Sequence, residues 1–296
     1  MRNTVNSIIN VLVCFVALLA STSVQAITLD SQGFIVNVEW LSENQFDTDI
    51  QIIDVRDETS YLQGHIANAI NIPVSKTFVQ SGEESRIGSL KYLQQLLSHA
   101  GIQHNKMIVV YADDIYKDAG RLFWVLEVLG HKQMKLLNGG FPAWLKNDLP
   151  VSKLATLLMP SEYIPRAKPE RLVSQLSMLL ALNDTSIHII DVRPADEYSG
   201  KTSKSTRFGH IPGANSVPVD LNFEIVDGVK VIKPIEQLRV LYGSAEGKTV
   251  YAYCNKGKAS SMTYTILRQL QHDVAVYDGS WYEWGNDPEL PIQRSR

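Results

Sequence analysis

The chain has 296 residues, of which 45% are hydrophobic and 20% are charged, and its formal net charge is −3 at pH 7. These values are typical of a soluble globular protein that is long enough for two domains. They give no indication of a nucleic-acid partner.

The first 26 residues differ in composition from the rest of the chain. An arginine near the start, the apolar stretch "VLVCFVALLA" and the small residues Val24 and Ala26 are typical of a signal peptide, residues 1–26, that is cleaved after Ala26. An uncleaved membrane anchor fits less well, because the apolar core is shorter than the ~20 residues that a spanning helix needs. We therefore expect export to the periplasm and no stable membrane association of the mature protein. Cys14 leaves with the signal, so the mature chain keeps Cys254 and forms no internal disulfide.

Residues 27–155 show strand and helix signals in alternation. Aliphatic and β-branched runs predict strands at 50–55 and 107–111, and apolar residues at helical spacing from Leu122 to Leu129 predict a helix after the second strand. Strands that alternate with helices predict an α/β fold, with a mostly parallel sheet that helices cover on both faces.

The stretch "VSKLATLLMPSEYIPRAKPE" interrupts this alternation, because it contains prolines and has no counterpart elsewhere in the chain. We place the linker at 156–164 and a second domain at 165–296. In this domain the sequence predicts strands at 187–192 and 249–253, and a helix that contains Met262, Ile266 and Leu270.

The two domains are copies of one unit. The segment "IIDVRDETSYLQGHIANAINIPV" at 52–74 returns, with an insertion, as "IIDVRPADEY" and "GHIPGANSVPV" within 189–219. Asp191, Arg193 and His210 all have counterparts in copy one, which lacks a cysteine for them to assist. We therefore expect these three residues to hold the fold rather than to act in catalysis.

Cys254 lies where the strand at 249–253 turns toward a helix, and ligands of parallel sheets bind beyond such strand ends. A loop that enters a helix points backbone N–H groups inward, and the helix start adds partial positive charge, so an anionic sulfur is stabilised there. Gly257 permits tight curvature, and two lysines add cationic charge. We predict Cys254 as a nucleophile, with substrate bound by Asn255, Lys256, Gly257, Lys258 and Ala259.

Four motifs carry a family resemblance. "DVRPADEY", "GHIPGANSVPV", the Cys254 loop and "YDGSWYEWG" resemble the tandem-domain rhodanese family of sulfurtransferases, of the thiosulfate or 3-mercaptopyruvate type. The resemblance implies two rhodanese-like domains and a Cys254 that takes a sulfane sulfur from a small-molecule donor, becomes a persulfide and passes the sulfur to cyanide or a thiol. It implies a first domain without a nucleophile, and Asp113 aligns with Cys254. It also implies chemistry that needs no metal and no organic cofactor.

The loop also bears on the identity of the donor. Thiosulfate enzymes resemble Cys-Arg-Lys-Gly-Val-Thr and mercaptopyruvate enzymes resemble Cys-Gly-Ser/Thr-Gly-Val-Thr, so Lys256 favours thiosulfate. Two departures weaken this match, because Asn255 and Glu197 stand where the family places arginines. We expect a replacement cation, Arg207 or Lys204, from the insertion before the second "GHI" motif; the alternative is a solvated basic loop.

The sequence leaves two other functions to consider. A phosphatase of the same fold has an arginine that clamps phosphate, but Ser260 occupies that position here, so phosphoryl transfer is disfavoured. The second alternative is a catalytically weak module that binds sulfur or a partner, which the missing arginines favour and the retained Cys254 disfavours.

Overall fold

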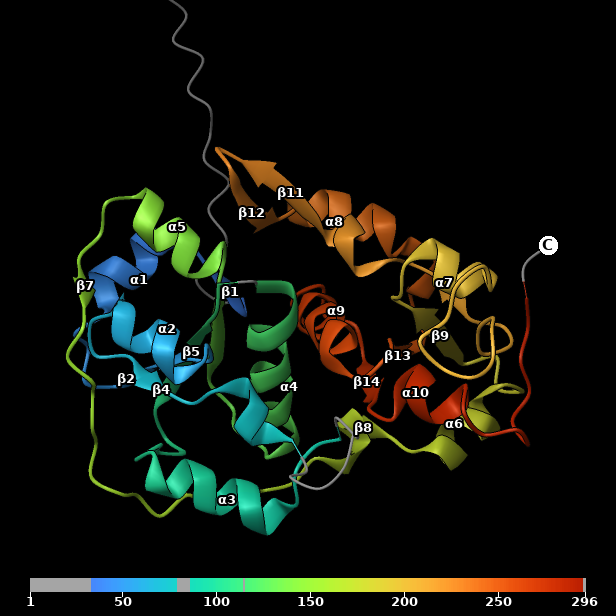
Figure 1. Cartoon of the computed structure of the whole chain (residues 1–296), viewed down its shortest axis with the longest axis horizontal. Coiled ribbons are helices and arrows are strands. Elements are labelled where there is room, and N and C mark those ends of the chain that lie inside the picture. Colours follow the sequence, from blue (N-terminus) through green and yellow to red (C-terminus); the bar gives the residue numbers. More distant parts are fainter. Residues whose placement is uncertain (1–32, 79–85, 114, 295–296) are drawn as a thin grey trace, which may run out of the picture.

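The structure, a computed structural model, describes residues 33–78, 86–113 and 115–294. The predicted signal peptide lies outside these residues. Two five-stranded sheets, one in each half of the chain, form the framework of the molecule (Figure 1).

The strands of the two sheets follow the same order. The first sheet contains β1 (Ile35–Val36), β6 (Met134–Leu137), β5 (Met107–Tyr111), β2 (Ile50–Asp54) and β4 (Ile70–Asn71). The second contains β8 (Leu172–Val173), β14 (Val274–Tyr277), β13 (Thr249–Tyr253), β9 (Ile187–Asp191) and β10 (Asn215–Ser216). Neighbouring strands are parallel throughout both sheets. The predicted α/β fold and the repeat are therefore confirmed, and the four predicted strands agree with the observed ones to within one residue.

Helices cover both faces of each sheet. In the first domain they are α1 (Val38–Asn44), α2 (Glu58–Gln63), α3 (Leu90–His99), α4 (Gly120–Val128) and α5 (Gly140–Lys146). In the second they are α6 (Gln175–Ala181), α7 (Ala195–Ser199), α8 (Ile235–Leu241), α9 (Lys258–Gln269) and α10 (Ser280–Trp284). Short antiparallel pairs complete the fold: β3 (His65–Ile66) with β7 (Val151–Ser152), and β11 (Phe223–Val226) with β12 (Val229–Ile232).

Alternation along the strands divides the core. In β2, Ile52 faces a cluster that α1, α2 and α5 cover, whereas Ile53 faces the cluster that contains α3 and α4. The cluster that contains Ile53 continues into the second domain through α9 and also includes Ile190 of β9. The two domains therefore share one hydrophobic core.

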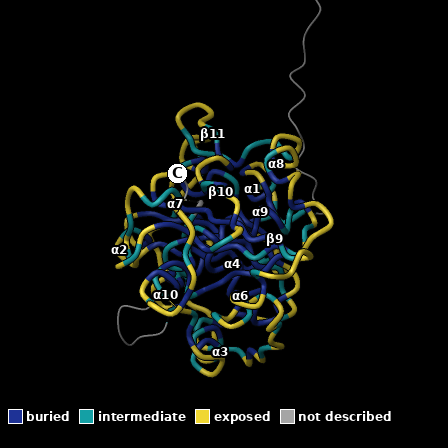
Figure 2. Tube along the Cα trace, turned by 90° about the vertical axis from the view of Figure 1, so that its right-hand side faces the viewer, coloured by how far each residue is buried: buried dark blue, intermediate teal, exposed yellow. Residues whose placement is uncertain are grey.

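Helices α4 and α9 lie side by side between the two sheets (Figure 1). The trace through α4 is buried, and exposed segments surround it (Figure 2). Gly120 begins α4, and a Cβ added there would lie 2.5 Å from the Cα of Met262 in α9. Glycine is therefore needed for the two backbones to approach this closely.

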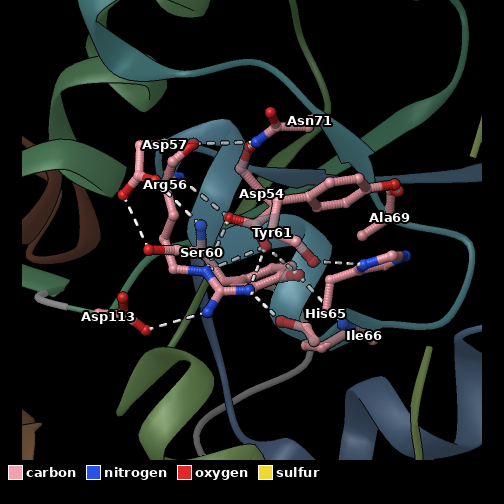
Figure 3. Close-up of polar contacts among 12 residues, drawn as sticks. Asp54, Arg56, Asp57, Ser60, Tyr61, His65, Ile66, Ala69, Asn71 and Asp113 are labelled. Atoms are coloured by element: carbon pink, nitrogen blue, oxygen red, sulfur yellow. Dashed lines mark hydrogen bonds and ion pairs between the residues drawn. The ribbon is translucent and has the colours of Figure 1, made fainter. Parts of the chain in front are cut away.

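The repeated aspartate and arginine form the same buried pair in both domains. Arg56 Nη2 donates to Asp54 at 2.6 Å, and the Tyr111 hydroxyl donates to the same carboxylate at 2.6 Å (Figure 3). The second copy repeats these contacts with Asp191, Arg193 and Tyr253. The Tyr253 side chain thus points toward Asp191 and away from the loop that follows Tyr253. In both domains the arginine joins the aspartate at the end of a strand to a glycine carbonyl in a loop.

The repeated histidines also have matching environments. His65 stacks on Tyr61 with ring centroids 3.7 Å apart, and its Nδ1 donates to the Tyr61 carbonyl at 2.8 Å (Figure 3). His210 stacks on Tyr198 at 3.8 Å and donates to its carbonyl at 2.8 Å. These contacts support the predicted structural role.

The segment after β7 crosses between the domains as extended chain, with neither helix nor strand between Ser152 and Pro169. Tyr163 in this segment is buried, and its hydroxyl lies 3.4 Å from His131 Nδ1. The domain boundaries predicted from the sequence, and the linker at 156–164, stay predictions.

Candidate functional site

Cys254 lies between the end of β13 and the start of α9, and 4% of it is exposed. Its N–H donates to the Ser280 hydroxyl at 3.2 Å, and its carbonyl accepts from Trp281 N–H at 2.9 Å. The Ser260 hydroxyl donates to Cys254 Sγ at 3.5 Å. In the sequence, Ser260 stands out only as the position that lacks a phosphatase arginine, and its contact with the sulfur was not predicted.

The loop after Cys254 curves tightly into α9. Gly257 has φ 77°, a left-handed conformation that favours glycine, and its N–H donates to the Ser280 hydroxyl at 3.2 Å. Lys258 then begins a helix of 12 residues, whose first N–H groups have no acceptor within the helix. Cys254 therefore lies next to the start of α9, where the helix dipole has its positive end.

A cavity of about 420 Å³ opens at the thiol. Five predicted site residues line it, namely Cys254, Asn255, Lys256, Lys258 and Ala259. Gly257 shapes the loop and does not line the cavity. A Cβ added to Gly257 would collide with Asp278 Oδ1 and Arg121 Nη1, so a larger residue does not fit there. The structure therefore brings the predicted loop residues together around one space.

Cations from both domains face this cavity. The Lys256 ammonium lies 4.4 Å from the centroid of the Tyr282 ring, and Lys258 Nζ lies 2.9 Å from Asp118 of the first domain. Lys117, also from the first domain, lines the cavity. Lys117 was not predicted as a site residue, because no local pattern in the sequence shows that it lies near the Cys254 loop across the domain interface.

The two departures from the family pattern contact each other. Asn255 Nδ2 donates to Glu197 Oε2 at 2.7 Å, and Lys204 Nζ lies 3.7 Å from Glu197 Oε1. Glu197 is buried at the side of the loop, where it positions the Asn255 amide and attracts Lys204. Lys204 lines the cavity, and its expected contact with the donor stays a prediction.

Arg207 does not line the cavity, so its predicted contact with the donor is wrong. Its guanidinium donates to main-chain carbonyls of the segment after α10, at 2.8 Å for both Trp284 and Leu290, and it also donates to Asp287. Carbonyl oxygens accept hydrogen bonds from the N–H groups of a guanidinium, as an anion does. The sequence does not reveal that these carbonyls lie close together.

The first domain supports the loop from behind. Arg121 in α4 is fully buried and pairs with Asp278, and its Nη1 also lies 3.5 Å from the Gly257 carbonyl. The Asp278 carboxylate also accepts from Ile87 N–H at 2.6 Å. The first domain therefore contributes buried charge that fixes the position of the Cys254 loop.

The sequence alignment of Asp113 with Cys254 is wrong by one residue. Tyr111 and Tyr253 make the same hydrogen bond to the repeated aspartate, and the Ala112 carbonyl accepts from Phe141 N–H as the Cys254 carbonyl accepts from Trp281 N–H. Ala112 is therefore the counterpart of Cys254, and the next residue, Asp113, is the counterpart of Asn255. Its carboxylate lies 3.3 Å from Arg56 Nη1 (Figure 3). Burial raises the pKa of Asp113, while the charge of Arg56 opposes that rise. The side chain at the position of the thiol in copy one is thus the methyl group of Ala112.

Two further properties concern the described residues only. None of their helices has both the length and the apolar character required to cross a membrane. In the same part of the chain, His, Cys, Asp and Glu side chains form no group of three or more that would hold a metal ion.

Comparison with known proteins agrees with this geometry. A family model described as "Rhodanese-like domain" matches residues 37–147 and 174–287. The chain is 28% identical over 284 residues to 3-mercaptopyruvate sulfurtransferase of Escherichia coli K12, covering 89% of this chain and 99% of the relative. It is 31% identical over 283 residues to putative thiosulfate sulfurtransferase 1 of Mycobacterium bovis, covering 88% and 97%. The crystal structure of 3-mercaptopyruvate sulfotransferase SseA from Escherichia coli superposes with a TM-score of 0.75 at 26% identity, covering 84% and 99%.

Proposed function

This chain belongs to the rhodanese family and is a tandem-domain sulfurtransferase, and from that premise we propose that it moves a sulfane sulfur from thiosulfate to a thiol or cyanide through a persulfide on Cys254. The observation that carries the proposal is the position of the buried Cys254 thiol, in a cation-lined cavity at the start of α9.

The proposed cycle has two balanced steps. The Cys254 thiolate attacks the outer sulfur of thiosulfate, a new S–S bond forms, and the old S–S bond breaks so that its electron pair leaves with sulfite. Cyanide or a thiolate then attacks the outer sulfur of the persulfide, and the Cys254 thiolate is released. The N–H groups at the start of α9 and the Ser260 hydroxyl stabilise the negative charge on sulfur in both steps.

Charge supports thiosulfate as the donor. Lys117, Lys204, Lys256 and Lys258 line the cavity together with a single carboxylate, Asp220. A dianionic donor and its sulfite leaving group gain electrostatic stabilisation in such a cavity.

3-Mercaptopyruvate is the second candidate donor. The loop has Asn255 in place of the arginine of thiosulfate enzymes, and the similar Escherichia coli protein is named for mercaptopyruvate. With this donor, the Cys254 thiolate would attack the thiol sulfur, a new S–S bond would form, and the C–S bond would break. Its electron pair would leave as the enolate of pyruvate, which takes up the thiol proton to give pyruvate.

Kinetics with both donors and one acceptor separate the two candidates. We expect a higher kcat/KM for thiosulfate, and a larger loss of it in Lys256→Ala than in Lys201→Ala, which removes an exposed lysine paired with Asp196. A higher kcat/KM for mercaptopyruvate would reverse the assignment of the donor. Thiocyanate formation that is undetectable with both donors would instead favour the sulfur-binding or partner-binding module.

We also propose that the protein acts in the periplasm. The support is the sequence of residues 1–26, with its apolar core and the small residues before the expected cleavage site. The intact mass of protein from a periplasmic fraction tests this: a chain that begins at Ile27 is expected, and a full-length chain in the cytoplasmic fraction would contradict it.

A further inference from the structure

The cavity at Cys254 is larger than thiosulfate or cyanide needs. Its volume of about 420 Å³ falls within the range of about 300–1,000 Å³ that is typical of sites for whole organic molecules. Thiosulfate and cyanide are ions of a few atoms each, so either of them fills only part of this space. The remaining volume is available to a larger substrate, and in the proposed cycle the acceptor thiol is the substrate whose size is not fixed.

One wall of the cavity is apolar. It is lined by Val192, Pro194, Pro218 and Val219. The Val219 N–H donates to the Val192 carbonyl at 3.0 Å, and both valines belong to the same buried cluster as Cys254. Apolar surface does not stabilise a small hydrated anion, whereas it binds a hydrocarbon chain, with a gain of up to about fourfold in affinity for each methylene group buried. The wall therefore fits a substrate with an organic body.

A cation from the first domain reaches the same cavity. Lys117 lines the cavity and belongs to the π-helix η2 (Ile115–Ala119), which leads directly into α4. The neighbouring Asp118 pairs with Lys258 at 2.9 Å, so this turn is held against the start of α9. π-helical turns are rare and are frequent at functional sites. A substrate that contacts both Lys117 and Cys254 spans the interface between the two domains.

The lysines of the Cys254 loop and Lys117 are suited to different substrates. Lys256 and Lys258 follow Cys254 within four residues. In thiosulfate the charge of the leaving sulfite lies one bond from the sulfur that Cys254 attacks, so the cations of the loop are placed to hold it. Lys117 adds a cation that the loop does not supply. An acceptor with an anionic group of its own gains from that additional cation.

We propose that Lys117 sets the acceptor specificity by binding a carboxylate of the acceptor thiol, while the organic body of the acceptor lies on the wall that contains Val192 and Val219. The inference rests on the proposed sulfur transfer and names the class of acceptor. The acceptor thiolate attacks the outer sulfur of the Cys254 persulfide, a new S–S bond forms, and the old S–S bond breaks with its electron pair on Sγ, so that an organic persulfide leaves.

Acceptor kinetics test the proposal. In a cycle with a covalent intermediate, kcat/KM for the acceptor reports the step that removes sulfur from the persulfide, so binding of the donor does not enter. The probes are 6-mercaptohexanoate and 6-mercaptohexanol, which have the same chain and nearly the same thiol pKa because their end groups are remote from the sulfur. We expect kcat/KM to be roughly three- to tenfold higher for the carboxylate thiol.

Variants of Lys117 assign the effect to that side chain. Lys117→Ala should bring the ratio of the two kcat/KM values close to one, and Lys117→Arg should retain most of the preference because it keeps the charge. Lys201→Ala is the matched control, since Lys201 is an exposed lysine that pairs with Asp196 and does not line the cavity. A preference for the carboxylate that persists in Lys117→Ala, or that is absent from the unmodified protein, would overturn the inference.

A binding measurement decides the inference without turnover. Cys254→Ser removes the thiol, and hexanoate and hexanol represent the two acceptors without their sulfur. Calorimetric titration of Cys254→Ser should give a lower Kd for hexanoate than for hexanol, and adding Lys117→Ala, but not Lys201→Ala, should abolish the difference. Equal Kd values for hexanoate and hexanol in Cys254→Ser would overturn the proposal. Selective binding of hexanoate by a protein that transfers no sulfur would contradict the proposed function and support the anion contact, so the two failures are distinguished.

Discussion

At the scale of single residues, Cys254 and its loop were predictable because their signals are local. A strand signal, a cysteine, a glycine and two lysines follow one another within ten residues. Ser260 was missed because its hydroxyl meets the sulfur only after the first turn of α9 brings residues six apart in sequence together. Arg207 was misassigned because its carbonyl partners come from a segment about 80 residues later.

Two cations of the insertion, Arg207 and Lys204, are expected to behave differently. Arg207→Ala removes the donor that joins several main-chain carbonyls, so it should lower the melting temperature and leave the KM for thiosulfate close to that of the unmodified enzyme. Lys204→Ala removes a cation from the cavity and should raise that KM by roughly two- to tenfold with little change in melting temperature. Steady-state kinetics and thermal unfolding of both variants test this. An unchanged KM in Lys204→Ala would remove Lys204 from donor binding.

At the scale of elements, β-branched and aliphatic runs predicted the strands, and apolar residues at helical spacing predicted the helices α4 and α9. Their packing against each other was not predictable, since an amphipathic pattern shows that a face is buried but not against which partner. Gly120 illustrates the difference. From the sequence it is a residue of low helix propensity, whereas in the structure it is where the backbone of α4 comes close to that of α9.

Gly120→Ala is expected to destabilise the protein. The added Cβ would lie 2.5 Å from the Met262 Cα, so the two helices must move apart, which typically costs about 1–3 kcal/mol of unfolding free energy. Gly243→Ala is the matched control, because nothing lies within 4 Å of its Cβ position. Chemical denaturation of both variants measures the difference. Equal midpoints would show that the α4–α9 contact tolerates an extra methyl group.

At the scale of the whole molecule, the repeat predicted two similar domains, but not the single core that runs through both of them. Sequence similarity between the two copies shows that each copy has the same internal fold. The residues that form contacts between the copies are different in the two copies, so the repeat does not predict these contacts. Arg121 with Asp278 and Lys258 with Asp118 are such contacts, and both tie the Cys254 loop to the first domain.

His131 makes the stability of the molecule depend on pH. Burial lowers the pKa of His131 to about 4, from 6.5 in an unstructured chain. Between these values the unfolded chain binds the proton and the folded protein does not, so the free energy of unfolding falls as pH falls from 6.5 to about 4. The expected loss is on the order of 3 kcal/mol.

Urea denaturation across this range measures the effect. His131→Gln should flatten the pH dependence, and His99→Gln should not, because His99 is exposed. An unchanged slope in His131→Gln would show that His131 is not the group that titrates.

The central claim is that Cys254 carries the transferred sulfur. Mass spectrometry of the purified protein after incubation with thiosulfate tests it most directly, with Cys254→Ser as the control. The account predicts one added sulfur atom on the peptide that contains Cys254, none in Cys254→Ser, and removal of that sulfur by cyanide with one thiocyanate formed for each sulfur lost. A Cys254 peptide of unchanged mass after both thiosulfate and 3-mercaptopyruvate would contradict it.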